Sequence, residues 1–560
     1  MKLSEKRLQT LLDLLLLMAL FWFVRYWHSR QFGLYEDDLT IIPDAFQRSF
    51  GSLTRFILAY VAHLSGHARP LSDSFVYLFS WLGWQFAGLW GPYLMGYAIT
   101  AINIVLFYWL IRRVADRPLA LLTGIAFVLY AADTTQAFLS LSLSLQPAVL
   151  LILLAMHSFL SNRRVLSYAL AFVVLFSYEL PFVLFVSAPL FTPVWNKRLL
   201  KELLLHTLIL AFMLGGIYGL RSYIGEGRVA GLTLKELVTT PLLHMIQGPL
   251  VNLGTLVLRP IQALQSLNGE IALAILVVFA VLVVVLWRLE VQPGLSLRSA
   301  WRNIRSHESL PEPMKALGRM AVIGVMLLVL AYPLTFTVRA YAISGRDTRV
   351  HAAGAAGAAL LAGCGAYFLL MLARDRWRWV MNILLAFFFA LMAGYGLVIQ
   401  SDYVRAWQLQ KQFWTALLPL IPDAGDGTVI LVDRAALTDT RQIGANYWNL
   451  PRVLRQLYDF PAGMQAVPVV HRLETGWENA LAGADGRMQV DATTTYSVPD
   501  YYGEFDPDKV ILIQAENGQL VRREVITLND KEYSLKPLSS PLLPNLPHGF
   551  LYSLLIAPNP

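Results

Sequence analysis

The sequence predicts a polytopic α-helical membrane protein with a C-terminal α/β domain that lies outside the membrane. Of the 560 residues, 56% are apolar and only 15% are charged, whereas soluble domains are roughly 45–50% apolar and about 25% charged. The mean hydropathy is +0.52. A water-soluble chain of this length could not bury so much apolar surface, so we expect most of it to lie in a bilayer.

Apolar stretches long enough to cross a membrane recur along the first 400 residues. A helix needs about 20 largely apolar residues to cross roughly 30 Å of hydrocarbon. By this measure we predict about eleven spans, with Pro181 separating two short halves in the region 165–195. The predicted spans lie near residues 9–28, 91–112, 118–132, 138–160, 165–178, 180–195, 202–220, 270–288, 320–338, 352–373 and 379–400.

The distribution of basic residues predicts the orientation of these spans. The formal charge is +8, but the basic residues form short clusters between apolar stretches and not one patch, which argues against nucleic-acid binding. Clustered Lys and Arg are typical of cytoplasmic loops. We therefore expect a bacterial inner-membrane protein with a cytoplasmic N-terminus, a retained first span and a periplasmic tail. The clusters are Arg112/Arg113/Arg117, Arg163/Arg164, Lys197/Arg198/Lys201, the stretch 288–319 and Arg374/Arg376/Arg378.

Three predicted external segments are long. Residues 29–90 contain two amphipathic stretches, Ile41–Val61 and Phe75–Leu89, which predict helices lying at the membrane interface. The second segment is 221–269. The third is the tail, 401–560, which we separate from the membrane domain, 1–400. In the tail we predict strands at 428–433 and 510–513, a hairpin turn at Asn517-Gly518 and a short helix at Trp448–Tyr458.

Two features of the first external segment are candidates for chemistry. Glu36, Asp37 and Asp38 are adjacent acids directly after the first span, where ionised carboxylates are costly and often functional. A solvated loop start with an Asx turn explains them equally well. Arg69, two residues after His67, supplies a guanidinium suited to bidentate phosphate contact. The Arg-Pro pair that it forms with Pro70 is also compatible with a helix start.

Six short motifs follow one another along residues 1–400: the pair Asp37-Asp38, Arg69-Pro70-Leu71, Gly91-Pro92, Arg112-Arg113, Ser177–Pro181 and Gly345–His351. In this order they resemble those of the GT-C glycosyltransferases, in particular the protein O-mannosyltransferase-like and TMTC-like branch. The extra acid Glu36 and the absence of aromatic residues from the motif Gly345–His351 depart from the family pattern.

The resemblance implies a GT-C-like helical bundle that transfers a sugar from a polyprenyl-phosphate (undecaprenyl-phosphate) donor, with inversion and without a cofactor. Asp37 matches the first acid of the family pair and is the expected general base, with Asp38 orienting it or contacting the acceptor. The arginines on the outer side are expected to hold the donor phosphate: Arg69, Arg221, Arg228, Arg346 and Arg349. Further substrate contacts are expected from Glu36, His67, Glu179 and His351.

We expect no bound metal, although a divalent ion on the acids stays open. Glu179 is as compatible with a water-exposed interfacial carboxylate as with a substrate contact. The acceptor is expected to be a periplasmic glycan, such as lipopolysaccharide, or a protein. Two alternatives remain: a transporter or flippase, and an O-antigen polymerase or ligase. Charged groups along a central path would favour transport.

Overall fold

The computed structural model describes residues 5–64, 68–226, 233–291, 312–335, 339–373, 375–444, 450–474, 476–494 and 502–556. The chain divides into two compact units, each described here by itself. The first unit comprises Met1–Arg30, Ser52–Ala137 and Leu141–Ser401, and the second comprises Gln31–Gly51, Phe138–Ser140 and Asp402–Pro560. The sequence assigned residues 31–51 to the membrane domain, whereas the structure groups them with the tail.

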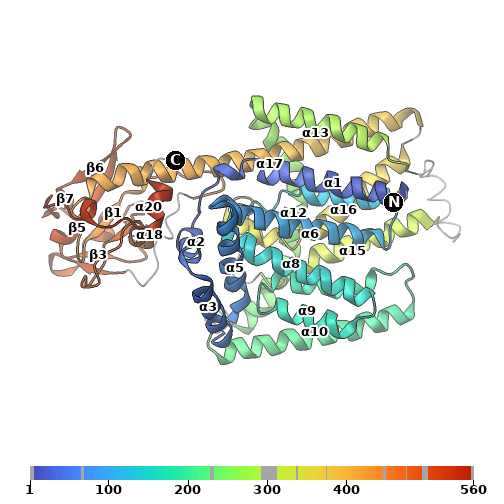
Figure 1. The fold of residues 1–560 in the computed structure, drawn as a ribbon, viewed down its shortest axis with the longest axis horizontal. Helices are drawn as coiled ribbons and strands as arrows, with labels where there is room; N and C mark the ends of the chain where they lie inside the picture. The colour runs from blue at the N-terminus through green and yellow to red at the C-terminus, as the bar shows by residue number, and fades with distance from the viewer. Residues whose placement is uncertain are drawn as a thin grey trace. The chain divides into compact units, whose positions relative to one another are not determined.

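The first unit is a bundle of helices, several of which run side by side in Figure 1. Its helices are α1 (Glu5–Tyr26), α3 (Phe50–Ala62), α5 (Pro70–Ala87), α6 (Trp90–Arg112), α7 (Arg117–Leu129), α8 (Leu139–Leu160), α9 (Arg164–Val174), α10 (Lys197–Tyr223), α12 (Leu234–Gln265), α13 (Gly269–Trp287), α15 (Glu312–Leu330), α16 (Ala355–Leu372) and α17 (Asp375–Leu417), with 3-10 helices η1 (Ser29–Gln31), η2 (Leu180–Leu190) and η3 (Arg346–His351). The last residues of α17, from Asp402 on, belong to the second unit.

Nine helices of the described residues are long and apolar enough to cross a membrane. The prediction of about eleven spans differs in four places. Three predicted spans are shorter helices: α7 with 13 residues, α9 with 11 and η2 with 11. Prolines divide the predicted pair 165–195, because Pro181 and Pro189 lie inside η2 and interrupt regular hydrogen bonding. The fourth difference is α12, which satisfies the length and hydropathy criteria.

Helix α12 occupies the segment that the sequence predicted to be an external loop. Although the segment contains three prolines, 32 of its residues form a single helix. Its polar side chains contact the ends of other bundle segments: His244 contacts Thr335, and Asn252 donates to Tyr332. These two residues and Arg259, which donates to the carbonyl of Ala131 at 3.0 Å, span about 22 Å of helix rise. Helix α12 therefore packs along one end of the bundle.

The second unit contains a small mixed sheet with strand order β2-β1-β5-β6. Strand β1 pairs in parallel with β2 and β5, whereas β5 and β6 form an antiparallel hairpin. The elements are α2 (Asp38–Gln47), η4 (Leu418–Leu420), β1 (Val429–Val432), η5 (Arg434–Ala436), α18 (Leu450–Leu457), β2 (Val469–Arg472), α19 (Glu478–Leu481), η6 (Ala484–Gly486), β3 (Met488–Val490), β4 (Gly503–Phe505), η8 (Pro507–Lys509), β5 (Val510–Glu516), β6 (Gln519–Arg523), β7 (Val525–Leu528), β8 (Lys531–Ser534), η9 (Leu543–Asn545) and α20 (Phe550–Leu555).

The local predictions for the tail agree with these elements. All four residues of β1 are buried, as are the first four of β5. Asn517 and Gly518 both have positive φ, 50° and 78°, which is the backbone that a two-residue type I′ hairpin requires. The predicted helix Trp448–Tyr458 corresponds to α18, and its first residues lie outside the described part of the chain.

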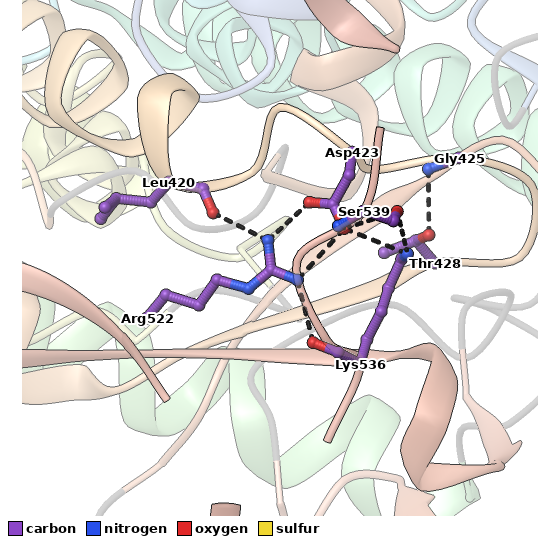
Figure 2. Close-up of polar contacts among 7 residues, drawn as sticks. All are labelled: Leu420, Asp423, Gly425, Thr428, Arg522, Lys536 and Ser539. Atoms are coloured by element: carbon purple, nitrogen blue, oxygen red, sulfur yellow. Dashed lines mark hydrogen bonds and ion pairs between the residues drawn. The ribbon is translucent and has the colours of Figure 1, made fainter. Parts of the chain in front are cut away.

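A buried ion cluster connects segments of the second unit that are far apart in the sequence (Figure 2). Asp423, 4% exposed, accepts hydrogen bonds from both terminal nitrogens of Arg522, at 2.5 and 3.2 Å, and from Ser539. Lys536 adds an ion pair at 3.1 Å. Arg522 also donates to the carbonyls of Leu420 and Lys536. The cluster thus joins the residues before β1 to β6 and to the segment after β8.

Candidate functional site in the helical bundle

The start of α5 positions Arg69 within the first unit. Pro70 occupies the first turn of α5, where its missing N–H costs nothing. The N–H of Leu71 donates to the carbonyl of Phe176 at 3.0 Å, which fixes the helix start against the turn between α9 and η2. Ala68 has a φ of 57°, a conformation that side-chain-bearing residues adopt rarely and often at functional sites. The sequence Arg69-Pro70-Leu71 therefore begins a helix and also places a guanidinium beside the α9–η2 turn.

Arg69, Glu179 and Arg221 form one cluster there. Arg69 pairs with one carboxylate oxygen of Glu179, and the Nη2 atom of Arg221 lies 3.5 Å from the other. Arg221 also donates to the carbonyl of Leu175 at 3.1 Å. Glu226, itself buried, adds a second carboxylate that acts electrostatically on Arg69. Three predicted site residues from three different elements thus share one place in the bundle.

The cluster keeps unused hydrogen-bond donors in a buried setting. The side chains of Arg69, Glu179 and Arg221 are 18%, 11% and 9% exposed. The Nε–H groups of Arg69 and Arg221 have no hydrogen-bond acceptor among the described residues. Burial alone would raise the pKa of Glu179, but the two arginines favour the charged form more strongly, so that this pKa lies below its usual value. A buried site with two guanidinium groups and spare N–H donors suits an oxyanion ligand.

The predicted motif Gly345–His351 lies on a different element, η3. Arg346 and Arg349 are both half-buried on η3, and the Nε atom of Arg349 has no acceptor among the described residues. The Thr348 side chain contacts that of Thr134 at 2.9 Å, which ties η3 to the segment after α7. His67 and Arg228, two further predicted site residues, lie outside the described residues.

His351 is a packing residue in this structure and not a surface group facing a substrate. It is fully buried. One ring nitrogen contacts the hydroxyl of Tyr332 at 2.8 Å, and the other contacts the carbonyl of Ala342 at 2.8 Å. Burial lowers the pKa of His351 to about 4, so the ring is neutral at physiological pH. The predicted substrate contact by His351 is therefore at odds with its surroundings, because both ring nitrogens already have protein partners.

The three acids after α1 belong to the second unit and differ from one another. Asp38 is fully buried, and its two oxygens accept hydrogen bonds at 2.8 Å from the backbone N–H groups of Leu139 and Ser140. Burial raises the pKa of Asp38 to about 7 despite these bonds. Asp37 is half-buried at the start of α2 and makes no side-chain capping bond there. Glu36 is buried with a φ of 52°. Asp38 therefore binds the first two backbone N–H groups of α8.

Sequence reasoning missed a polar group at the end of α1. Arg25 donates to the side chain of Gln136 at 2.8 Å and to the carbonyl of Asp133 at 3.2 Å. A cavity of about 100 Å³ begins at these residues and is lined along α8 from Leu141 to Met156, about 22 Å of helix rise. The signal that could have found it is a charged residue at the end of the otherwise apolar first predicted span.

Searches with models of known protein families, among curated proteins and among solved structures found no match to this chain.

Proposed function

We propose that this protein is a membrane glycosyltransferase that takes a sugar from a polyprenyl-phosphate donor and passes it to an acceptor outside the cytoplasm. The proposal places the chain in the bacterial inner membrane, with its N-terminus in the cytoplasm and residues 401–560 in the periplasm. The observation that carries it is the buried cluster of Arg69, Glu179 and Arg221. Two guanidinium groups whose Nε–H donors have no acceptor among the described residues suit the phosphate of a lipid-linked sugar.

The chemistry follows from the charges that the reaction must handle. The acceptor hydroxyl attacks the anomeric carbon, its proton passes to a carboxylate, and the lipid phosphate departs with the electron pair of the broken bond. Arginines stabilise the negative charge that develops on this leaving group. Asp37 is the carboxylate proposed as the base, by the resemblance of its motif, while Asp38 is a positioning residue whose oxygens bind Leu139 and Ser140.

The small volume of the bundle cavity argues against this cavity as a path for a sugar. Sites for sugar-sized ligands commonly measure roughly 300–1,000 Å³, whereas the cavity beyond Arg25 has a volume of about 100 Å³. Its wall beyond Gln146 is apolar, with Val149, Ile152 and Met156 on α8. A hydrated sugar does not fit such a slot, but a slender segment of a lipid chain does.

The test is a transfer assay with the full chain in lipid nanodiscs, a panel of polyprenyl-phosphate sugars and a panel of glycan and peptide acceptors. We expect release of polyprenyl phosphate with one donor class, and Asp37→Asn to lower the rate by about 10²–10⁴ because an amide cannot accept the proton. Asp44→Asn is the matched control and should retain activity, because Asp44 pairs with Arg48 at a more exposed place on α2. Full activity of Asp37→Asn would remove it as the base, and absence of turnover with every donor would defeat the proposal.

A further inference from the structure

A second cavity lies in the second unit, apart from all residues discussed so far as a site. It has a volume of about 480 Å³, within the usual range for small-molecule sites of roughly 300–1,000 Å³. One wall is the end of α17, and the others come from the segment after β1, the start of α18 and the turn of the β5–β6 hairpin. Its lining includes Gln410, Trp414, Leu437, Leu450 and Leu520.

The floor of this pocket contains a polar group without a protein partner. Gln410 is 8% exposed, and neither its Oε1 nor its Nε2 atom has a hydrogen-bond partner among the described residues. Burying an amide without partners costs roughly 1–3 kcal/mol. Trp414, 2% exposed, lies four residues later on α17 and therefore on the same helix face. The pocket floor thus combines the Gln410 amide, a hydrogen-bond donor and acceptor without a protein partner among the described residues, with the apolar ring of Trp414.

The rim and the charge of the pocket restrict its ligand further. Three side chains at the rim are uncharged, polar and exposed: Gln412, Thr438 and Gln519. None of the described residues that line the pocket is charged. An anionic ligand such as a phosphate would find no countercharge in this lining, and a plain hydrocarbon would leave the Gln410 amide unsatisfied. A neutral ligand that carries hydroxyl groups satisfies both conditions.

We infer that this pocket binds a neutral sugar residue or a short neutral oligosaccharide. The Gln410 amide can accept from one ligand hydroxyl and donate to its neighbour, and the partly exposed side chains of Phe413 and Leu520 in the lining offer apolar surface to the C–H groups of a pyranose ring. Leu420, which forms part of the wall, is held by Arg522 at its carbonyl (Figure 2). Identifying the ligand with the sugar acceptor rests on the proposed transferase function, whereas the binding itself does not.

The test is a binding measurement by saturation-transfer NMR, using the full chain in nanodiscs free of glycoside detergent. The probes are mannobiose and chitobiose as neutral disaccharides, and a glucuronic-acid disaccharide as the acidic comparison. We expect one or both neutral probes to bind and the acidic one to bind more weakly. Gln410→Met should weaken neutral binding by about tenfold or more. Gln408→Met is the matched control, since Gln408 lies on the same helix but is exposed and does not line the pocket.

A stability measurement separates ligand binding from a structural role of Gln410. If Gln410 serves a ligand, Gln410→Met should leave the melting temperature of the free protein unchanged or raise it, because a partnerless buried amide is removed. A structural role predicts a lower melting temperature. Ala416→Trp, which fills the exposed side of the pocket, should also abolish binding without touching the amide.

Three results would overturn the inference: no neutral disaccharide binds, Gln410→Met binds as well as the unmodified protein, or the acidic probe binds best. Because no donor is present in the assay, its outcome is independent of transfer. Loss of transfer with retained disaccharide binding would contradict the proposed function alone. Transfer without disaccharide binding would contradict the pocket alone.

Discussion

Each of the two units contains a carboxylate that lies between two cations. In the bundle, Glu179 lies between Arg69 and Arg221. In the tail, Asp423 lies between Arg522 and Lys536. Both carboxylates are largely buried. The clusters differ in how completely the protein itself satisfies their hydrogen-bonding groups.

The tail cluster also has one Nε–H without an acceptor among the described residues, that of Arg522, but its other charged groups have several protein partners. Asp423 accepts from a guanidinium, an ammonium and a serine, and Arg522 also binds two backbone carbonyls. In the bundle, Glu179 is the one acceptor of Arg69 among the described residues, and Arg221 has one carbonyl besides Glu179. A cluster whose charged groups have several protein partners stabilises a fold, whereas spare donors are available to a ligand. We therefore expect mutation of a cation to lower stability in the tail cluster and to weaken ligand binding in the bundle cluster.

The largest expected effect is on the stability of the tail. Arg522→Ala removes four hydrogen bonds and leaves Asp423 buried with fewer partners. Breaking a buried ion pair in this way costs roughly 3–5 kcal/mol. Denaturant unfolding, followed by the fluorescence of the tryptophans in the tail, measures this loss of stability. The neighbouring Arg523→Ala is the control, because Arg523 pairs with Glu516 at the surface and such pairs are worth about 0–1 kcal/mol. Equal losses for the two variants would contradict the interpretation of the tail cluster as stabilising.

The next effect concerns ligand binding in the bundle. Arg69→Lys should weaken binding of a short-chain polyprenyl phosphate by about tenfold or more, about 1.4 kcal/mol, because an ammonium cannot make the planar two-point contact. Stability should change little, since Glu179 keeps Arg221. Calorimetry and thermal unfolding of the same preparations measure the two quantities. Arg164→Lys is the control, because Arg164 pairs with Glu202 at a more exposed place. Unchanged affinity in Arg69→Lys would remove this residue from the phosphate site.

The smallest expected effect is a pH dependence confined to the tail cluster. Although burial alone would raise it, hydrogen bonds and charges from Arg522 and Lys536 hold the pKa of Asp423 well below its usual value. An unfolded aspartate has a pKa of about 3.9. The stabilisation by Asp423 is therefore present above that pH and is lost as the pH falls below it. Asp423→Asn should flatten the acid limb of the unfolding profile, and an unchanged acid limb would contradict this.

Local sequence patterns were sufficient for much of the fold. Long apolar runs predicted α1, α6, α8 and α13, and the buried runs of β1 and β5 predicted two central strands. The segment 221–269, which the sequence predicted to be external, contains the 32-residue helix α12, whose polar side chains contact the ends of other segments.

The candidate site could be predicted only as a set of residue types. Adjacent acids suggested a shared role for Asp37 and Asp38, but Asp38 is buried and binds the first two backbone N–H groups of α8. His351 looked available for substrate and is enclosed by Tyr332 and Ala342. Nothing in the sequence around Gln410 distinguishes it from Gln408, because burial depends on segments that meet only in the folded chain.

The sequence by itself determined the membrane-type composition, the positions of most long helices and the main strands of the tail, because hydropathy and periodicity are local properties. Tertiary structure alone decided which charges share a partner. Glu179 pairs with Arg69, 110 positions away, and with Arg221, 42 positions away. Whether a buried charge is satisfied depends on groups brought to it from distant segments, and no local pattern records that.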